Sequence, residues 1–299
     1  MKTPRQIIAE LDRMYDAGWR SNIFFVDDNF IGNKQYLKTQ LLPALIEWRK
    51  AKKGCVFFTE ASINLADDPE LMDMMAEAGF DSVFIGIETP DVNSLTECCK
   101  THNKNRDLLQ DVKKIHRSGL QVMGGFIVGF DSDPPSIFQR QIDFIQQSGI
   151  VTAMVGMLQA PPGTLLFESL AREQRVCTEF SGDNVDGRTN IIPAMGLDKL
   201  VDGYRSIMRQ IYAPREYYQR VRRILKELKG PAATTPTDWQ RILAFWRACL
   251  RLGVFGKERF QYWRLLMWTM VQRPKLMPLA VTLAIYGYHY RKICERYIL

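Results

Sequence analysis

The first half of the chain alternates between two hydrophobic patterns. Near the N-terminus, Ile7, Ile8, Leu11 and Met14 recur every three or four positions, which places them on one face of a helix. Short apolar runs that are typical of strands then follow one another, at residues 22–27, 55–60, 81–88, 121–129 and 151–158. Their starts, near residues 22, 55, 82, 121 and 151, are about 27–39 residues apart, the length of one strand–helix unit. The pattern predicts at least five consecutive βα units with parallel strands, in a barrel or an open doubly wound sheet. The run from Val83 to Ile87 is nearly continuous, which favours burial on both faces.

The helices of this repeat have recognisable starts and ends. Thr3-Pro4, Asp68-Pro69 and the segment 132–135 read as helix starts, with a capping side chain before proline. A glycine follows each helical stretch, and glycine adopts the left-handed conformation that commonly ends a helix. We therefore expect positive φ angles at the helix ends, at Gly18, Gly54, Gly79, Gly119 and Gly149.

The pattern changes after about residue 165. Residues 181–196 are rich in Gly, Asp and Asn and predict a loop, residues 197–228 predict amphipathic helices, and residues 230–237 predict a short linker. The remainder is basic, aromatic and predicted to be helical. Its most apolar run, residues 276–286, has 11 residues, whereas a membrane span needs roughly 20. We expect a buried helix there, and we expect Trp263 and Trp268 to be core residues.

The composition is that of a globular protein. Of 299 residues, 46% are hydrophobic and 24% charged, which argues against a disordered, collagen-like or coiled-coil chain. The six cysteines form no disulfide framework, and the N-terminus has no secretory signal, so we expect a reduced, cytoplasmic setting. The charge is unevenly distributed: residues 201–299 carry 19 Lys and Arg against 6 Asp and Glu, whereas residues 1–200 carry 21 against 27.

Candidate chemistry lies where the predicted strands end, because sites of parallel βα folds gather at the carboxyl ends of strands. Asp27, Asp28 and Asn29 end the first run, and Glu60 and Glu88 end the second and third. Glu88 directly follows an apolar strand, where an unpaired carboxylate is costly, and this favours a ligand role. Glu60 is equally compatible with structural pairing across a barrel. Asp28 and Asp133 are equally compatible with helix capping.

Other familiar chemistries are poorly represented. The three histidines are scattered, Cys98 and Cys99 are adjacent, and no cysteines have zinc or cluster spacing, so we predict no metal site. The glycine-rich run 124–129 lies within a strand and lacks dinucleotide spacing. The methionines are expected to fill the core (Met72, Met74, Met75, Met154 and Met157).

Five motifs nevertheless form an ordered set: VDDNF at 26–30, FTEA at 58–61, GIETP at 86–90, the segment 124–133 and the segment 159–164. In this order and at these spacings they resemble the radical SAM enzymes that carry a cobalamin-binding domain. Segments 204–218, 262–268 and 285–289 resemble the C-terminal extension of a subgroup that includes the hopanoid C-2 methyltransferases. The resemblance covers nearly the whole chain.

The resemblance implies an α/β fold: an incomplete parallel (βα)6 barrel over residues 1–165, followed by a mainly α-helical, basic and aromatic-rich extension over residues 166–299. It also implies a pocket for S-adenosylmethionine. Asp27, Asp28 and Asn29 match the motif near the methionine amine, and Glu88 matches the residue that contacts the ribose. Gly125, Ile127 and Gly129 match the motif beside the adenine, with Ser132 in place of its final acid, and the backbone near Gln159 completes the pocket. Glu60 is carried as a further cofactor-binding candidate.

The chain departs from the family in one decisive place. The family holds a 4Fe–4S cluster with a C-x3-C-x2-C motif after the first strand, and this sequence has no such motif. It also lacks the preceding cobalamin domain, and its first helix pattern begins where the family's first barrel helix begins. We therefore interpret the chain as the C-terminal portion of a longer enzyme, with the cluster supplied by an upstream segment or a partner chain.

Three hypotheses compete. The first is a fragment of a cobalamin-dependent methyltransferase, in which a 5′-deoxyadenosyl radical abstracts hydrogen from an unactivated carbon of a lipid-like substrate such as a hopanoid. Its basic C-terminal region would rest on the inner membrane face. The second is a non-catalytic basic protein that binds nucleic acid or a membrane surface through its C-terminal region. Its aromatic residues fall in helical apolar patterns, however, so no nucleic acid is expected as a partner. The third is a complete βα enzyme that uses Asp27, Glu60 and Glu88 with a divalent metal.

Overall fold

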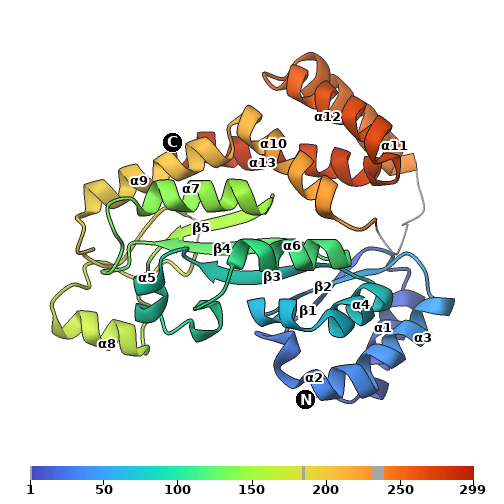
Figure 1. The fold of residues 1–299 in the computed structure, drawn as a ribbon, viewed down its shortest axis with the longest axis horizontal. Coiled ribbons are helices and arrows are strands. Elements are labelled where there is room, and N and C mark those ends of the chain that lie inside the picture. Colours follow the sequence, from blue (N-terminus) through green and yellow to red (C-terminus); the bar gives the residue numbers. More distant parts are fainter. Residues whose placement is uncertain (1, 184–185, 231–238) are drawn as a thin grey trace.

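The computed structural model describes residues 2–183, 186–230 and 239–299 (Figure 1). Five parallel strands form one sheet in the order β1-β2-β3-β4-β5. They are β1 (Asn22–Phe25), β2 (Val56–Glu60), β3 (Phe80–Glu88), β4 (Gln121–Val128) and β5 (Ala153–Met157). The predicted βα repeat is confirmed. Because sequential strands are neighbours throughout, the order is that of an open barrel, and the doubly wound alternative is wrong.

Helices follow each strand and cover one face of the sheet (Figure 1). The helices of this half are α1 (Pro4–Asp16), α2 (Lys34–Tyr36), α3 (Leu42–Ala51), α4 (Pro69–Ala78), α5 (Val92–Glu97), α6 (Leu108–Ser118) and α7 (Ile137–Ser148). A π-helical segment, Leu37–Leu41, continues α2 into α3. Helix α8 (Leu165–Arg172) follows β5, and the predicted domain boundary at 165/166 falls at its start. That boundary stays a prediction.

Most of the predicted helix boundaries are confirmed. Thr3 and Gln6 form a capping box at the start of α1, and Asp68 caps α4 through the Leu71 N–H. The expected helix-ending glycines all have positive φ (Gly18, Gly54, Gly79, Gly119 and Gly149). The expectation for segment 132–135 is wrong in detail, since α7 begins at Ile137 and its N-cap Ser136 makes no side-chain capping bond.

The two faces of the sheet differ. Val83, Ile85 and Ile87 of β3 are fully buried beneath the helices, whereas Phe84 and Gly86 between them are only half-buried. Strand β4 alternates in the same way, with Val122 and Val128 buried. The expectation of burial on both faces is therefore wrong: one face is packed and the other, the inner face of the open barrel, is accessible. This alternation brings every second strand residue to the inner face.

The C-terminal part is helical, as predicted. It comprises α9 (Leu197–Ile211), α10 (Pro214–Glu227), α11 (Trp239–Ala248), the π-helical segment η5 (Cys249–Val254), α12 (Arg259–Gln272) and α13 (Met277–Tyr297). Its core is continuous with that of the sheet, because α9 packs on α7 and β5, and α10 packs on α6. The predicted loop at 181–196 is irregular where it is described, and the linker at 230–237 lies outside the described residues except for Gly230.

A buried arginine joins the two parts. Arg220 of α10 is fully buried and donates to Gln146 Oε1 of α7 at 3.0 Å and to the carbonyl of Ile211 at 2.8 Å. Its guanidinium also lies 5.3 Å from the ring centre of Tyr217. The apolar run at 276–286 is largely buried within α13, as expected. Within the described ranges, no helix is both long enough and apolar enough to cross a membrane.

Candidate functional site

The inner face of the sheet is lined by aromatic and sulfur-containing side chains. Phe24 of β1 stacks on Phe58 of β2 with ring centres 4.7 Å apart. Phe84 and Met123 of the central strands are half-buried, and Met154 of β5 is 43% exposed. The expectation that Met154 fills the core is therefore wrong, although Met72, Met75 and Met157 are buried as expected and Met74 is partly buried against the core. This face offers an apolar surface of the kind that binds an organic ligand.

Glu88 lies at the carboxyl end of β3 on this face. Its backbone has φ 63°, a left-handed conformation that is unfavourable for a residue with a side chain. The register between β3 and β4 shifts between Gly86 and Glu88, and such irregularities re-aim side chains next to sites. The carboxylate is mostly buried and accepts an ion pair from Lys100 Nζ to Oε1 at 2.8 Å. The ammonium group of Lys100 offsets the cost of burying this carboxylate.

Two glycines near Glu88 leave the backbone beside its carboxylate free of side chains. Gly86 pairs in register with Gly125, so two residues without side chains lie beside each other on adjacent strands. A Cβ added to Gly86 would come within 2.5 Å of Glu88 Oε1, and one added to Gly125 within 2.9 Å of Phe84 Cζ. Ile127 follows on the same face and pairs with Gly156 of β5. The result is a flat backbone floor beside a carboxylate, which a planar ring can approach closely.

Two buried amides brace this floor from behind. Gln141 of α7 is fully buried, and its Nε2 donates to the carbonyl of Glu88 at 3.1 Å and to that of Ile127 at 2.8 Å. Asn103 Nδ2 donates to the carbonyls of Gly86 and Ile87 at 3.0 and 2.9 Å. Sequence reasoning missed both, because neither belongs to a motif and their partners lie 14–53 residues away along the chain.

The loop after β4 is held by carboxylates. Asp133 accepts the N–H groups of Gly129 and Phe130 at 2.8 and 3.1 Å and the Ser94 hydroxyl at 2.6 Å. It therefore closes the turn after β4 and does not cap α7. Burial raises the pKa of Asp133 above its ordinary value.

The remaining acids of this turn also have structural contacts. Arg175 binds both carboxylate oxygens of Asp131 at 2.6 Å and lowers the pKa of that group. The N–H of Ser132 donates to Glu97 Oε2 at 2.8 Å. Neither flanking acid is therefore free to replace the motif acid that Ser132 lacks.

The end of β1 lies next to the end of β2. Asp27, Asp28 and Asn29 are exposed in the turn that follows β1. Asn29 Oδ1 accepts the Ser62 N–H at 3.1 Å, which ties this turn to the residues after Glu60. Among the described residues, Asp27, Asp28 and Glu60 make no side-chain hydrogen bond or ion pair, so the capping prediction for Asp28 is wrong and so is the cross-barrel pairing considered for Glu60.

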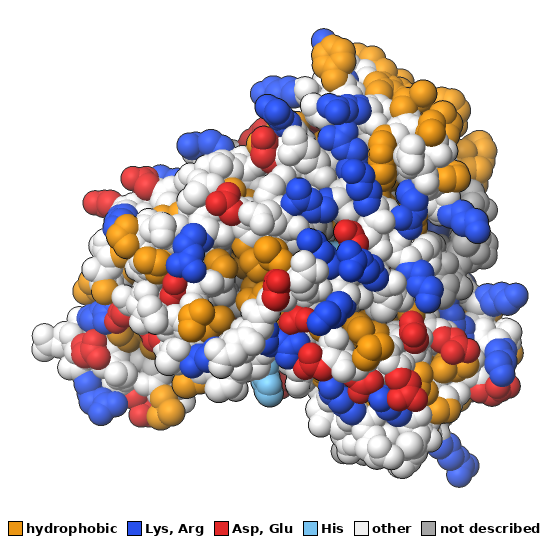
Figure 2. All heavy atoms as spheres, in the orientation of Figure 1, with side chains coloured by type: hydrophobic (Ala, Val, Ile, Leu, Met, Phe, Trp, Pro, Cys, Tyr) orange, Lys and Arg blue, Asp and Glu red, His pale blue; other side chains and the backbone are white. Residues whose placement is uncertain are grey.

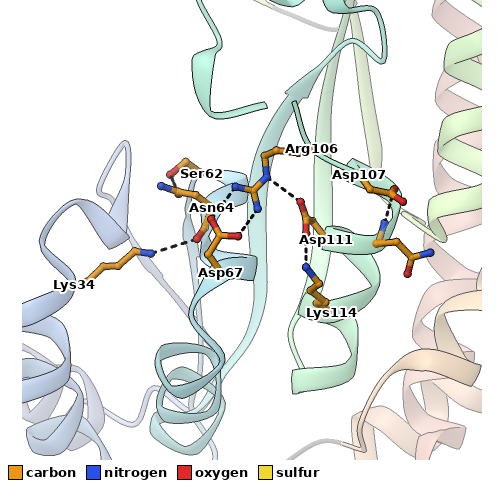
Figure 3. A network of polar contacts seen from close by, with 9 residues as sticks. Lys34, Ser62, Asn64, Asp67, Arg106, Asp107, Asp111 and Lys114 are labelled. Carbon is orange, nitrogen blue, oxygen red and sulfur yellow. Dashed lines mark hydrogen bonds and ion pairs between the residues drawn. The ribbon is translucent and has the colours of Figure 1, made fainter. Parts of the chain in front are cut away.

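A network of polar contacts connects the residues that follow β2 to helix α6 (Figure 3). Ser62 Oγ contacts Asn64 Oδ1 at 2.6 Å, and Lys34 Nζ donates to the Asn64 carbonyl. Three residues further, Asp67 is bound by Arg106 at 2.6 and 2.8 Å, and Arg106 also donates to Asp111 at 2.9 Å. Arg106 lowers the pKa of Asp67 below its ordinary value. The network holds the segment after β2 against the start of α6.

Gln159 and Gly129 complete the set of predicted positions. Gln159, just after β5, is nearly buried and donates through Nε2 to the Asp183 carbonyl at 2.8 Å. Gly129 has φ 106° at the end of β4. The structure thus brings Glu88, Gly125 and Ile127 together on neighbouring strands, with Gly129 and Gln159 at the ends of the next two, and Glu60 and Asn29 toward β1. Their roles as cofactor-binding residues stay a prediction.

Metal ligation finds no support in the part of the chain that the structure describes. No group of three or more His, Cys, Asp or Glu side chains there could hold a metal ion. Glu88 Oε1 is already paired with an ammonium group, which opposes a cation at the same oxygen. The metal-dependent alternative with Asp27, Glu60 and Glu88 is thus not supported. The cysteines are also scattered, with Cys55, Cys249 and Cys294 buried, so these residues do not fit a 4Fe–4S cluster.

Comparison with known proteins defines the class. Residues 1–145 match the model of the radical SAM superfamily, and residues 164–298 match a domain of unknown function, DUF4070. Residues 1–145 of the chain therefore form a radical SAM domain. Enzymes of this family use S-adenosylmethionine and a 4Fe–4S cluster.

Its relatives are methyltransferases. The chain is 37% identical to an uncharacterized methyltransferase of Synechocystis sp., over 99% of this chain and 57% of the relative. It is 34% identical to the hopanoid C-2 methylase of Rhodopseudomonas palustris, over 88% of this chain and 51% of the relative. The bacteriochlorophyllide d C-12(1)-methyltransferase of Chlorobaculum tepidum is 27% identical over 63% of this chain and 40% of the relative. The chain spans about half the length of the curated relatives it matches.

A solved structure shares the fold. The radical S-adenosylmethionine methyltransferase TsrM from Kitasatospora setae, solved with cobalamin and a 4Fe–4S cluster bound, aligns with a TM-score of 0.51. The match covers 97% of this chain and 56% of TsrM at 13% sequence identity. It supports the expected radical SAM-type α/β fold with a helical C-terminal part.

Proposed function

We propose that this chain forms the S-adenosylmethionine-binding part of a radical SAM methyltransferase that acts on an unactivated carbon of a lipid-like substrate, in the hopanoid class. The family match and the relatives support methyl transfer. The hopanoid C-2 methylase supports the substrate class. In such enzymes S-adenosylmethionine, bound beside a reduced cluster, supplies the radical that removes a substrate hydrogen, and cobalamin supplies the methyl group.

The observation that carries the proposal is the left-handed Glu88 beside the Gly86–Gly125 floor. A strained residue persists only where its surroundings hold it, and such residues cluster at functional sites. Gln141 and Asn103 hold the backbone here, so the carboxylate stays aimed across the floor. Oε2 of Glu88 has no partner among the described residues, which leaves it free to accept ribose hydroxyls while Lys100 stays on Oε1.

The neighbouring residues fit the other parts of the cofactor. The floor formed by Gly86 and Gly125 suits the flat adenine, with Ile127 as an apolar neighbour. The exposed carboxylates of Asp27 and Asp28, with Asn29, suit the methionine ammonium. The backbone near Gln159 closes the far end. The stacked Phe24–Phe58 pair and Met154 then offer apolar contact to a lipid-like substrate.

The proposal is tested by S-adenosylmethionine titration in a calorimeter. Loss of one charge-assisted acceptor costs about 1.5–3 kcal/mol, so Glu88→Gln is expected to bind roughly 10- to 100-fold more weakly than the unchanged chain. The matched control is Glu47→Gln, an exposed acid of α3 that pairs only with Lys50. Equal affinity in the unchanged chain and Glu88→Gln would remove Glu88 from the pocket.

The reaction is tested separately in the longest native form of the protein. After anaerobic reconstitution, that form is expected to absorb near 400 nm and to methylate a hopanoid. We propose a cytoplasmic location at the inner face of the membrane, where such a substrate resides. If the reconstituted protein shows no cluster absorbance but still binds S-adenosylmethionine, the proposed pocket would stand and the proposed radical chemistry would be wrong.

A further inference from the structure

A bare apolar surface covers the outside of α11, η5 and α12. Its exposed side chains include Trp246, Leu250, Phe255, Phe260, Met267 and Val271, and we call these six residues the α11–α12 surface. Phe255 is 81% exposed and Phe260 75%, so they gain almost nothing from the fold itself. Single exposed apolar residues are ordinary, but a contiguous group marks a binding surface. Figure 2 shows hydrophobic side chains gathered at the upper right of the molecule, where Figure 1 places α11 and α12.

Packing within the chain accounts for only one side of α12. Tyr262, Leu265 and Leu266 are buried, and α12 packs against α10 and α13. Phe260, Met267 and Val271 lie on the same helix and are exposed. A helix that is apolar on all sides is normally buried on all sides. Trp263 belongs to the same pattern, because it is 44% exposed and the expectation that it is a core residue is wrong.

The charge of this region is of one sign. Between residues 239 and 273 the sequence has seven Lys and Arg and a single acid, Glu258. Glu258 is 3% exposed and forms an ion pair with Arg291, so no exposed carboxylate lies within this segment. Arg247, Lys257 and Arg264 make no salt bridge with any described residue. In Figure 2, Lys and Arg side chains lie directly beside the apolar group.

We propose that the α11–α12 surface docks on an anionic lipid bilayer. Helices that lie in the membrane interface combine Trp, Phe and Leu on one face with Lys and Arg beside it. Aromatic rings settle at the headgroup level, and each basic residue near an anionic surface adds attraction. A nucleic acid would match the charge and the rings but not Leu250, Met267 and Val271, which offer nothing to phosphate or base. This inference rests on the surface alone and does not depend on the proposed methyl transfer.

The test is flotation of the full chain with vesicles of two compositions. One is pure phosphatidylcholine, and the other contains 30% phosphatidylglycerol. We expect binding to the anionic vesicles that weakens with added salt, and little binding to the neutral ones. Brominated acyl chains are expected to quench tryptophan fluorescence on binding, and Trp246→Phe is expected to reduce the quenched signal, which would place Trp246 at the acyl boundary.

Two pairs of variants separate the charge from the apolar face. Arg247→Gln with Arg264→Gln is expected to reduce partitioning about thirtyfold, since each basic residue contributes about 1 kcal/mol. Arg5→Gln with Lys53→Gln removes the same charge elsewhere and is expected to change it little. Phe255→Gln with Phe260→Gln is expected to reduce partitioning more than tenfold, whereas Leu165→Gln, 84% exposed on α8, leaves it unchanged. All seven side chains altered in these variants are exposed, so circular dichroism is expected to show an unchanged fold.

Five results would overturn the proposal. The first three are absence of binding to anionic vesicles, equal binding to neutral vesicles, and equal losses in the control variants. The fourth is a concentration-dependent dimer in the ultracentrifuge that Phe255→Gln with Phe260→Gln abolishes, which would assign the surface to a second copy. Binding by the 299-residue chain that disappears in a longer native form would equally overturn it, because the surface would then lie in an intramolecular interface.

Discussion

The inner face of the sheet and the α11–α12 surface both expose apolar side chains, but in different company. On the inner face, Phe84 and Met154 lie with Glu88 and two glycines, on strands whose ends are pinned by hydrogen bonds. On α11 and α12 the apolar side chains lie with arginines, on helices that no described element covers. The first arrangement selects a small ligand by shape and by a few polar groups, and the second suits an extended partner. Exposed apolar area alone therefore does not identify a site, whereas the polar groups beside it do.

The largest expected effect is on stability and concerns Arg220, which joins the part of the chain that contains the sheet to the helical C-terminal part. Replacing it with Met removes donors from Gln146 and the Ile211 carbonyl inside the core, and we expect a loss of about 3 kcal/mol in the free energy of unfolding. The measurement is urea denaturation followed by far-UV circular dichroism. Arg223→Met is the matched control, because Arg223 is exposed and contacts the Gln146 carbonyl from outside. A loss no larger than that of the control would mean that Arg220 does not hold the regions together.

The next effect depends on pH and arises where α6 meets the C-terminal part. His116 is fully buried without a side-chain partner in the described structure, and burial lowers its pKa to about 3. The unfolded chain takes up a proton below about pH 6.5 while the native state does not, so stability falls as pH falls toward 3. At pH 5 the expected loss is about 2 kcal/mol relative to neutral pH. His116→Leu is expected to flatten this part of the pH profile, and an unchanged profile would assign the dependence to other groups.

Alanine substitutions at the adjacent Gly124 and Gly125 are expected to have different effects, because the two residues lie on opposite faces of the sheet. Gly124 faces the helices, where an added Cβ would lie 2.8 Å from Phe126 and 3.1 Å from Ile150. Gly124→Ala is expected to cost about 1–2 kcal/mol of stability through overpacking. Gly125→Ala projects toward the half-exposed Phe84 ring and is expected to weaken S-adenosylmethionine binding while costing less stability. Thermal unfolding and calorimetric titration of both variants measure the two effects, and the reverse outcome would mean that the floor is not the ligand surface.

The smallest expected effect concerns the network of Figure 3. Arg106 lowers the pKa of Asp67, so their interaction stabilises the fold above the unfolded value near 3.8 and is lost as pH falls through the lower folded value. Since Asp67 is half exposed, we expect Arg106→Gln to cost about 1 kcal/mol at pH 7. The cost is expected to vanish in acid. Chemical denaturation at pH 7 and at successively lower pH checks this, and a cost that does not decline as the pH falls below 3.8 would point to packing by the arginine stem.

The regular features could be predicted from sequence because their causes are local. Gly79 and Gly119 end helices through their own φ freedom, and Thr3 caps through a neighbour three residues away. The strands are predictable for the same reason. The exposure of one sheet face is not predictable, because the apolar sequence from Val83 to Ile87 is compatible with burial of one face or of both. The strand-end position of Glu88 was predictable, whereas its conformation was not. That conformation depends on a register shift, on Lys100 and on Gln141, which only the tertiary fold brings together.

The errors have one physical source. Trp263 and Met154 follow apolar periodicity as core residues do, and periodicity records which face a residue lies on without recording whether that face is covered. Asp133 illustrates the same limit for polar groups, because a carboxylate before a helix can cap it or close the preceding turn. Both outcomes satisfy its hydrogen-bonding capacity.

The order of the strands also has a consequence in time. In the described structure β1 and β5 each have a strand partner on one side only, whereas β3 is bonded on both sides. A backbone amide exchanges its hydrogen with solvent only when its bond opens, and opening spreads from the least supported strand. Amides of β3 are therefore expected to exchange last and those of the four-residue β1 first. The strand that carries Glu88 would then keep its shape during fluctuations that loosen the turn of Asp27 to Asn29. The two ends of the proposed pocket would therefore open at different rates.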